Sequence, residues 1–438
     1  MRLPTTATAP FCPSAVQGSV QVPACAPRWR RRFAFAGSGL LVAVGYMDPG
    51  NWATDIAAGS RYGYALLSVI LFSSLIAMFL QGLCVRLGLA TGLDLAQHCR
   101  ESFSGPTRFV LWLFAEVAII ACDLAEVLGT ALAIFLLTGV PLSTGVLLTA
   151  LDTVFVLALQ GRGFRRLEAI ILGLVATIAL CFAFQVALAH PLWGQVAAGF
   201  IPNAQVFSER EAWYLAIGIL GATVMPHNLY LHSAIVQTRK VGPSVAEQRE
   251  AISFTTWDSS VALAAAFLVN AAILILAASA FHAHGETRVT EIEDAHRLLT
   301  PLLGTGLASA AFAIALFAAG QSSTLTGTIA GQVVLEGFWK LKIPCWQRRL
   351  ITRVLAVVPA WIGIMWLGEG GLGRMLIASQ VVLSMQLPFA VAPLIWFTAS
   401  RRRMGDLAVP GWVAAIGWTV CVLILAANAW MVLAVVSG

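Results

Sequence analysis

The residues of this chain best suited to chemistry lie inside an apolar stretch, residues 40–58, that is long enough to cross a membrane. Asp48 and Asn51 stand in its middle, separated by Pro49 and Gly50. Proline lacks a backbone N–H and glycine disfavours helix, so this pair predicts a break in the helix. Hydrocarbon tolerates such a break only where protein or a water-filled cavity receives the freed backbone groups. An ionisable Asp48 at the break therefore indicates half of a substrate site.

A second apolar stretch, residues 211–237, contains a matching interruption at Pro226, between Met225 and His227. The two breaks fall in the first and the sixth predicted spans, so each opens one half of the chain. Paired interrupted helices at corresponding positions are the sequence pattern that best indicates a transporter's binding site. The alternative for residues 48–51 is a turn outside the membrane. The small and apolar residues before them, and the recurrence at Pro226, favour the membrane site.

The two breaks offer three different donor atoms: a carboxylate oxygen from Asp48, an amide oxygen from Asn51 and a thioether sulfur from Met225. Hard oxygens alone suit Mg²⁺ and Ca²⁺, whereas a thioether shifts the preference toward softer transition metals. Unwinding at the two prolines would also free backbone carbonyls as ligands, namely those of Gly45 or Tyr46 and of Ala222. The mixed set predicts a site for Mn²⁺ or Fe²⁺ that also accepts Cd²⁺.

Two carboxylates, Asp123 and Glu126, lie three residues apart and therefore on one face of the third predicted span. Carboxylates in mid-membrane are costly unless they are protonated or paired. Arg353 is the only lysine or arginine that we place inside a span rather than at its edge, so it is the expected partner. The three residues predict a proton wire. The alternative is a buried salt bridge that holds helices in register.

Two histidines and a glutamine complete the candidate set. His227 and His232 have side chains that titrate near neutral pH and could shuttle protons, although a membrane histidine is more often a hydrogen-bonded packing residue. Their spacing is not that of the HExxH zinc motif. Gln380 could face the site from the tenth predicted span, with Gln386 as its competitor. We assign no role to three further polar residues of the predicted spans, Asp152, Asp258 and Gln321.

The composition places all of these residues in a polytopic membrane protein. Of the 438 residues, 59% are hydrophobic and 11% charged, and the mean hydropathy is +0.83. Runs of roughly 18 or more mainly apolar residues predict about eleven transmembrane helices, near 33–58, 64–88, 107–138, 142–160, 166–189, 211–237, 252–281, 303–336, 350–367, 373–398 and 411–436. The fold class is therefore all-α. No stretch of domain size lacks such runs, which excludes a soluble protein.

The positive charges fall mainly on one side of the predicted membrane. With the N-terminus in the cytoplasm, alternate loops place only a few arginines outside, namely Arg61, Arg210, Arg288, Arg297 and Arg374. This asymmetry follows the positive-inside rule, and it places the C-terminus outside. The net charge of +6 is then a topology signal and gives no reason to expect nucleic acid as a partner. The eight scattered cysteines indicate neither a disulfide framework nor a zinc site.

The chain divides into a tail and one transporter domain. Residues 1–32 predict a disordered cytoplasmic tail, because they lack the continuous apolar core of a signal peptide. Residues 33–438 predict the transporter domain, with 33–189 and 211–398 as two halves and 411–436 as an additional helix. Each half has five spans, an odd number, so the halves must have opposite orientations in the bilayer. The result is a 5+5 inverted repeat with broken helices 1 and 6.

Two charged groups outside the spans carry weaker expectations. Glu168, with Arg165 and Arg166, predicts a solvated cytoplasmic face. A cluster of acidic residues and histidines in one external loop could concentrate cations, but a solvated loop is the better interpretation. Its members are His282, His284, Glu286, Glu291, Glu293, Asp294 and His296.

Five segments resemble motifs of the NRAMP family (natural resistance-associated macrophage proteins), and they occur in the family order. They are GYMDPGNWATDIAAGS (45–60), ACDLAEVLGTA (121–131), GATVMPHNLYLHSAIVQTR (221–239), RRLITR (348–353) and SQVVLSMQLPFAVAPL (379–394). The joint occurrence of DPGN and MPH is highly specific. The resemblance is to bacterial members and spans nearly the whole chain from residue 33 onward.

The resemblance implies a LeuT-like fold and proton-coupled import of divalent transition metals across a bacterial inner membrane. By motif position it implies that Asp48, Asn51, Met225 and the Ala222 carbonyl bind the metal. The Gly45 carbonyl and Gln380 would contribute in particular conformations. The proton route implied by the motifs contains Asp123, Glu126, His227, His232 and Arg353. Related magnesium transporters lack the methionine, so Met225 argues against that branch.

The sequence thus predicts a proton-coupled Mn²⁺/Fe²⁺ importer that works by alternating access. Metal and protons are its expected cargo, the bilayer its surroundings, and no cofactor is expected. A transporter of the same fold for an amino acid or Na⁺ would need no methionine at the break. A metal channel would show no proton coupling. An enzyme would need a base and a nucleophile beside a metal, and the sequence offers no such constellation, so we expect no enzymatic activity.

Overall fold

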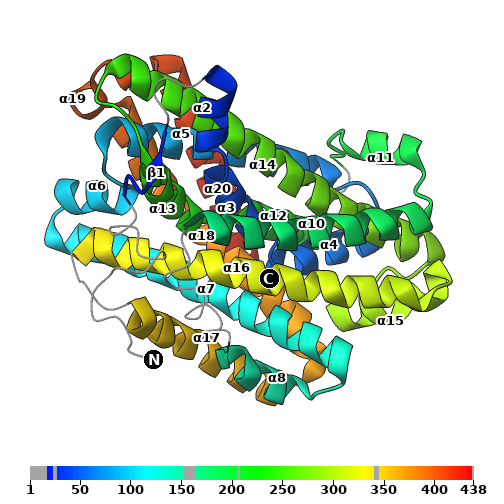
Figure 1. Cartoon of the computed structure of the whole chain (residues 1–438). Coiled ribbons are helices and arrows are strands. Elements are labelled where there is room, and N and C mark those ends of the chain that lie inside the picture. The colour runs from blue at the N-terminus through cyan, green and yellow to red at the C-terminus, as the bar shows by residue number, and fades with distance from the viewer. Residues whose placement is uncertain (1–16, 23–26, 152–163, 205–207, 340–344, 437–438) are drawn as a thin grey trace.

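The computed structural model describes residues 17–22, 27–151, 164–204, 208–339 and 345–436. Within these residues the chain is a bundle of helices with one short parallel pairing of strands β1 (Val20–Gln21) and β2 (Arg239–Lys240) (Figure 1). The longer helices are α5 (Leu67–Thr91), α7 (Gly105–Thr138), α10 (Phe164–Ala189), α14 (Val245–Ala280), α16 (Gly306–Trp339), α17 (Cys345–Leu367), α18 (Leu372–Ala399) and α20 (Gly411–Val436).

Most of the expected membrane spans are present in the described part of this bundle. Eight helices of the described chain are long and apolar enough to cross a membrane. The first and sixth spans are each split in two, into α3 (Ser38–Gly45) and α4 (Pro49–Tyr62), and into α12 (Arg210–Val224) and α13 (Pro226–Ile235). The fourth begins as α8 (Leu142–Leu148) and η1 (Thr149–Leu151). The rest of that span, with Asp152, lies outside the described residues.

Both breaks form where the prolines predict them. Pro49 and Pro226 each occupy the first turn of a new helix, the position where the missing N–H costs nothing. Asp48 is the N-cap residue of α4, and its side chain accepts a hydrogen bond from the backbone N–H of Asn51. Met225 separates α12 from α13 with a φ of 38°, a value rarely adopted by residues other than glycine.

Long unbroken helices surround the two broken ones. Helix α4 packs against α14, α12, α18 and α7, and α13 packs against α5, α16 and α18. The broken segments, which carry the candidate ligands, therefore lie in the centre of the bundle. Short helices close its two ends: α6 (Leu95–Ser102) and α19 (Arg401–Met404) lie at one end, and α11 (Trp193–Gly199) and α15 (Ile292–Leu303) at the other (Figure 1).

The structure differs from the expected disordered tail where it describes residues 17–22 and 27–32. Strand β1 pairs with β2, and α2 (Arg28–Phe35) is a helix that packs on α14. Arg31 pairs with Glu250, and the Arg32 guanidinium lies 3.3 Å from the centre of the Trp257 ring. These contacts with α14 fix a basic segment that has no apolar core of its own. Residues 1–16 and 23–26 lie outside the described residues.

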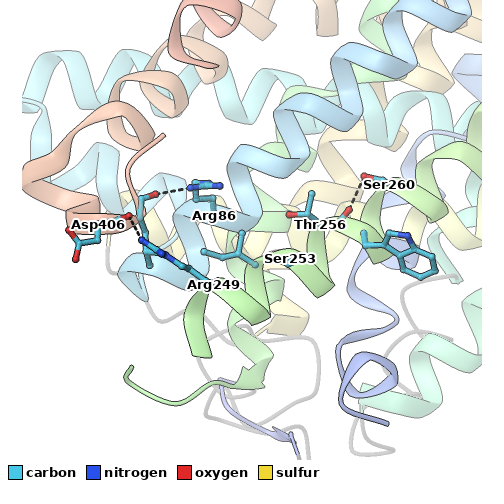
Figure 2. A pocket seen from close by; sticks show the side chains of 9 residues that line it. Arg86, Arg249, Ser253, Thr256, Ser260 and Asp406 are labelled. Carbon is cyan, nitrogen blue, oxygen red and sulfur yellow. Dashed lines mark hydrogen bonds between the residues drawn. The ribbon is translucent and has the colours of Figure 1, made fainter. Parts of the chain in front are cut away.

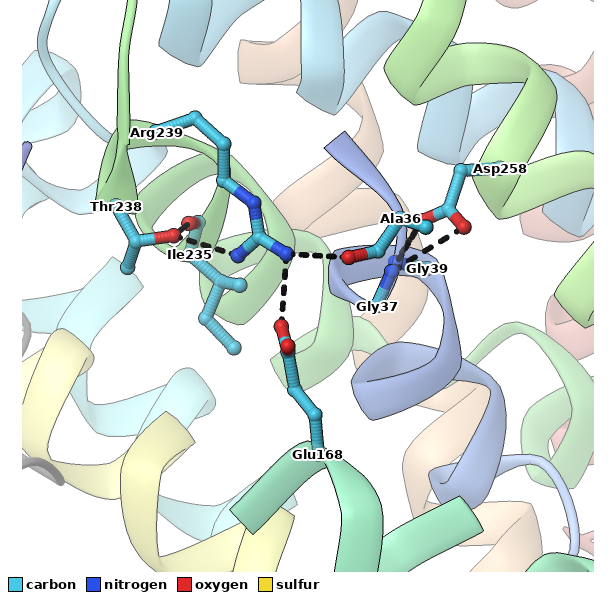
Figure 3. A network of polar contacts seen from close by, with 8 residues as sticks. All are labelled: Ala36, Gly37, Gly39, Glu168, Ile235, Thr238, Arg239 and Asp258. Carbon is cyan, nitrogen blue, oxygen red and sulfur yellow. Dashed lines mark hydrogen bonds and ion pairs between the residues drawn. The ribbon is translucent and has the colours of Figure 1, made fainter. Parts of the chain in front are cut away.

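The expectation of a solvated face around Glu168 is wrong for that residue. Glu168 is buried, and its Oε1 lies 2.7 Å from Nη2 of the equally buried Arg239 (Figure 3). The same Nη2 donates to the Ala36 carbonyl at 2.7 Å. A buried charge must be paired, and the partner comes from a segment about seventy residues away in the chain, which the local pattern of charges could not reveal.

Asp258, to which we assign no role from the sequence alone, belongs to the same polar network. Its carboxylate accepts hydrogen bonds from the backbone N–H groups of Gly37 and Gly39, the latter at 2.9 Å. These are unpaired donors at the start of α3, where a carboxylate is favoured. The expected external loop also differs, because α15 buries Ile292, Ala295 and Leu299 against the bundle.

Candidate metal-binding site

Asp48 occupies the break of the first span and is completely buried. Its Oδ1 accepts hydrogen bonds from the Asn51 backbone N–H at 3.0 Å and from Asn51 Nδ2 at 2.5 Å. Its Oδ2 has no hydrogen-bond partner in the described part of the chain. Buried polar atoms are almost always hydrogen-bonded, so this oxygen is available for a ligand.

The break of the sixth span lies directly beside the first. Asn51 Nδ2 also donates to the Ala222 carbonyl at 3.1 Å, and the Tyr46 hydroxyl lies 3.5 Å from the Val224 carbonyl. A single amide group therefore bridges a carboxylate and a carbonyl, two of the expected ligands. The positive end of an amide dipole stands between them, where a cation would be equally well placed.

Met225 is completely buried at the second break. Its Sδ accepts a hydrogen bond from Asn228 Nδ2 at 3.6 Å, and its side chain packs among Ala118, Ala121 and Leu383 of α7 and α18. Its positive φ is backbone strain of the kind that structures retain at functional sites. The side chain thus sits at the break in a pocket of small apolar residues.

Two glycines allow the partners of these residues to approach. A Cβ at Gly50 would collide with the Gln380 amide and would lie 3.0 Å from Asp48 Oδ2. Gln380, and not its competitor Gln386, therefore meets the first break. A Cβ at Gly45 would collide in the same way with the Asn228 amide. The structure thus brings Gln380 to Asp48 and Gly45 to the segment that follows Met225.

Sequence reasoning missed three polar residues around the breaks. Asn270 Nδ2 donates to the Tyr46 carbonyl at 2.8 Å and to Asn51 Oδ1 at 3.3 Å. Asp55 lies one turn after Asn51 on α4 and is buried like Asp48. The third is Asn228. Each has a buried oxygen without a partner among the described residues, as does Gln380. A signal was present, since each is a lone amide or acid within an apolar span.

These residues could bind a metal only by combining different kinds of donor atom. No group of three or more His, Cys, Asp or Glu side chains that could hold a metal occurs among the described residues. A site at the breaks must therefore combine a carboxylate with amide and carbonyl oxygens and a thioether. Such a mixture of hard and soft donors suits first-row transition metals better than Mg²⁺ or Ca²⁺.

The carboxylate pair of α7 lies near the first break, with Glu126 one helical turn and Asp123 nearly two turns before Gly129. Glu126 accepts a hydrogen bond from Ser323 of α16 at 2.6 Å, and Glu126 and Asp123 both face Gly327, where a Cβ would lie 3.0 and 3.1 Å from their oxygens. Gly129, three residues after Glu126, packs directly against the Pro49 ring. The charges of Asp48 and Glu126 are close enough to interact.

Arg353 contacts a backbone carbonyl and lies near the carboxylate pair. Its Nε and Nη2 donate to the Thr149 carbonyl at 3.2 and 3.0 Å, and its charge interacts with that of Glu126. A buried ion pair lies two turns from Asp123 along α7, where Glu116 binds Arg348 at 2.6 Å. Sequence reasoning missed Glu116, although its spacing of seven residues from Asp123 places it on the same helix face.

The two histidines have different surroundings. His232 is hydrogen-bonded through both ring nitrogens, to Gln81 Oε1 at 2.9 Å and to Ser259 Oγ at 3.2 Å. Gln81 in turn donates to the Tyr46 hydroxyl at 2.8 Å, so this chain of contacts leads to the first break. His227 is also buried, and its Nδ1 has no partner in the part of the chain that the structure describes.

Comparison with known proteins identifies relatives over almost the whole chain. The model of the family Nramp, natural resistance-associated macrophage protein-like, matches residues 39–434. "Divalent metal cation transporter MntH 1" of Pseudomonas aeruginosa is 62% identical over 97% of this chain and 97% of its own length. The MntH protein of Ralstonia nicotianae is 58% identical over 100% of this chain and 99% of its own.

Solved structures agree with these relatives. The crystal structure of a manganese transporter from Eremococcus coleocola has a TM-score of 0.87 at 38% identity, over 95% of this chain and 89% of that one. The transporter Mhp1 has a TM-score of 0.63 at 15% identity, over 98% of this chain and 93% of its own. At that identity the likeness concerns the fold alone, which is LeuT-like.

Proposed function

Because this chain belongs to the Nramp family, we propose that it imports divalent transition-metal ions, Mn²⁺ and Fe²⁺, across a bacterial inner membrane and couples this import to protons. The names of its relatives support a divalent metal as cargo, and that of the E. coleocola structure supports manganese. The chain would work as a carrier and not as an enzyme, with metal and protons as its cargo.

The observation that carries the proposal is the unsatisfied Asp48 carboxylate at the meeting point of two broken helices. Asp48 Oδ2 is buried without a partner among the described residues, and Asn51 Nδ2 bridges Asp48 Oδ1 and the Ala222 carbonyl. A metal entering here would replace the amide N–H groups, and a turned Asn51 amide would then offer its oxygen. Met225 would add the soft donor that disfavours Ca²⁺.

Proton coupling would use the carboxylates of α7. Asp48 would release a proton when metal binds, because a bound cation favours the ionised carboxylate. Glu126 lies one turn, and Asp123 nearly two turns, from the residue of α7 that packs on Pro49, and Arg353 interacts with Glu126. These residues form a polar path from the break toward Glu116 and Arg348. His227 and His232 would act beside it, on the sixth span.

Alternating access follows from the burial of the site. Asp48, Asn51 and Met225 are all at most 1% exposed, so metal reaches them only after one end of the bundle opens. Segments α3 and α12, or α4 and α13, can tilt separately because the helices are interrupted at the site. This is the conformational change that broken helices permit in transporters of this architecture.

The proposal is tested by Mn²⁺ uptake into proteoliposomes that contain a pH dye, for the wild type and Asp48→Ala. We expect saturable Mn²⁺ entry with acidification of the lumen, and loss of both in the variant. Mn²⁺ entry without acidification would contradict the proposed proton coupling and indicate a channel or a uniporter. No Mn²⁺ entry from well-folded wild-type protein would overturn the metal assignment and return the question to another solute.

A further inference from the structure

A groove of about 690 Å³ lies between α5, α14 and η6 (Gly405–Leu407), and none of the residues assigned above to metal or protons lines it. Figure 2 shows side chains that line it from the three elements. Those that matter here are Arg86 of α5, Arg249, Ser253, Thr256 and Trp257 of α14, and Asp406 of η6. The transport proposal does not require such a group of residues.

Two arginines meet in this groove without a neutralising acid. Arg86 Nη1 donates to the Leu407 carbonyl at 3.0 Å, and Arg249 Nη2 lies 3.4 Å from the Asp406 carbonyl (Figure 2). Both contacts are to backbone, and the two positive charges interact with each other. Neither guanidinium forms an ion pair within the described residues, Asp406 included. Two like charges held together this way attract an anion.

The groove also offers hydroxyl donors. Ser253 and Thr256 lie on α14 between Arg249 and Trp257, three residues apart and therefore on one helix face. Neither side chain donates a hydrogen bond to another residue in the part of the chain that the structure describes. Arginines and hydroxyls are the side chains that most often hold phosphate oxygens.

The surroundings of the groove indicate a lipid as the source of that phosphate. Trp257 is 52% exposed at its edge, and the Arg32 guanidinium of α2 lies over the Trp257 ring. On α2 itself, Trp29 and Phe33 are 58% and 71% exposed among four arginines. Exposed aromatic rings beside arginines are typical of helices that lie in the membrane interface. A soluble anion would need no such apolar rim.

We propose that this groove binds the headgroup of an anionic phospholipid, with Arg86 and Arg249 on the phosphate, Ser253 and Thr256 as additional donors, and Trp257 beside the upper acyl chain. Basic pockets between transmembrane helices are known to hold lipid headgroups at the cytoplasmic side, and the charge distribution of the sequence places this end of the bundle there. The proposal is independent of which ion the chain carries.

The test is native mass spectrometry of the full chain in detergent, titrated with phosphatidylglycerol, phosphatidylcholine or inorganic phosphate. For the wild type we expect phosphatidylglycerol to bind at least tenfold more tightly than phosphatidylcholine. The double substitution Arg86→Gln with Arg249→Gln should weaken that binding about 30-fold, since each arginine near a lipid surface contributes on the order of 1 kcal/mol.

A matched control separates the groove from the general positive charge. Arg401→Gln with Arg402→Gln removes the same charge from exposed positions at the same end and should leave the affinity unchanged. Ser253→Leu keeps both arginines but fills the groove, and it should also weaken binding. Equal affinities for all variants would overturn the proposal. If inorganic phosphate competes with the lipid at equal concentration, the assignment of a lipid ligand is wrong and the groove is a site for free phosphate.

Discussion

At the scale of single residues, the closed site is held by the Asn51 amide. Its Nδ2 satisfies Asp48 Oδ1 and the Ala222 carbonyl, while its Oδ1 receives Asn270 Nδ2. In the proposed metal-bound state, a cation would take the place of the N–H groups and these contacts would have to change. The Asn51 amide can therefore serve both expected states: its N–H group holds the closed site without metal, and its oxygen would bind the metal. Neither aspartate nor alanine offers both a donor and an acceptor at this position.

The thioether of Met225 is expected to set selectivity more than affinity. Met225→Leu keeps an apolar side chain of similar volume among Ala118, Ala121 and Leu383 and removes the sulfur. We expect Mn²⁺ uptake to persist while the preference for Mn²⁺ over Ca²⁺ falls about tenfold, the effect of roughly 1.4 kcal/mol of ligand preference. Competition of Ca²⁺ with Mn²⁺ uptake in proteoliposomes measures this. Unchanged selectivity would show that the sulfur is not a ligand.

Asp123 is expected to carry protons, whereas Glu116 supports the structure. Asp123→Asn should slow acidification about tenfold or more while metal binding remains, because a neutral amide cannot pass a proton on. Glu116→Gln leaves Arg348 buried without its carboxylate and should destabilise the fold by a few kcal/mol. Proton flux and thermal unfolding, measured on both variants, separate the roles. Normal proton flux in Asp123→Asn would show that Asp123 carries no protons and has only a structural role.

At the scale of elements, the break in the first span needs Gly50 as much as Pro49. A Cβ on residue 50 would occupy the place of the Gln380 amide beside Asp48. We expect Gly50→Ala to lower the Mn²⁺ affinity at least tenfold and to leave the unfolding temperature within a few degrees, because alanine favours helix. Gly173→Ala on α10, where nothing lies within 4 Å, is the control. Equal uptake by both variants would contradict this role of Gly50.

These elements could be predicted from the sequence, because long apolar runs indicate membrane helices and proline indicates where they break. It could not predict which helix supplies the partner of a buried polar group. Glu168 pairs with Arg239, and Asn51 accepts a hydrogen bond from Asn270. These partners are far apart in the chain, so the local periodicity of the sequence does not indicate them. Similarly, α2 looked disordered because its stability comes from Glu250 and Trp257 on α14 and not from its own residues.

At the scale of the whole molecule, one polar network connects the elements that must separate if the site is to open at the basic end. Arg239 lies in β2 after α13, Glu168 lies near the start of α10, and Asp258 of α14 caps α3 through Gly37 and Gly39 (Figure 3). Arg239 also holds the Ala36 carbonyl. The contacts thus tie the start of the first span to α10, α14 and strand β2, and opening must break the buried ion pair.

Glu168→Gln is therefore expected to favour the state that is open at the basic end. Buried Cys84 reports this state, because it lies one helical turn after Gln81, whose side chain donates to the Tyr46 hydroxyl at the first break. We expect its rate of labelling by a polar maleimide to rise about tenfold, corresponding to roughly 1.4 kcal/mol less cost of opening. Mass spectrometry of the labelled peptide measures the rate.

Two comparisons distinguish opening from loss of the fold. Cys421 of α20 is also buried but lies on a helix outside the network, so its labelling should not change in Glu168→Gln. Arg297→Gln breaks the exposed pair with Glu293 and should leave Cys84 protected, since exposed pairs contribute little. If both cysteines become reactive together, Glu168 stabilises the whole bundle and the network is no gate. If Cys84 alone responds, the ion pair between Arg239 and Glu168 holds the basic end closed.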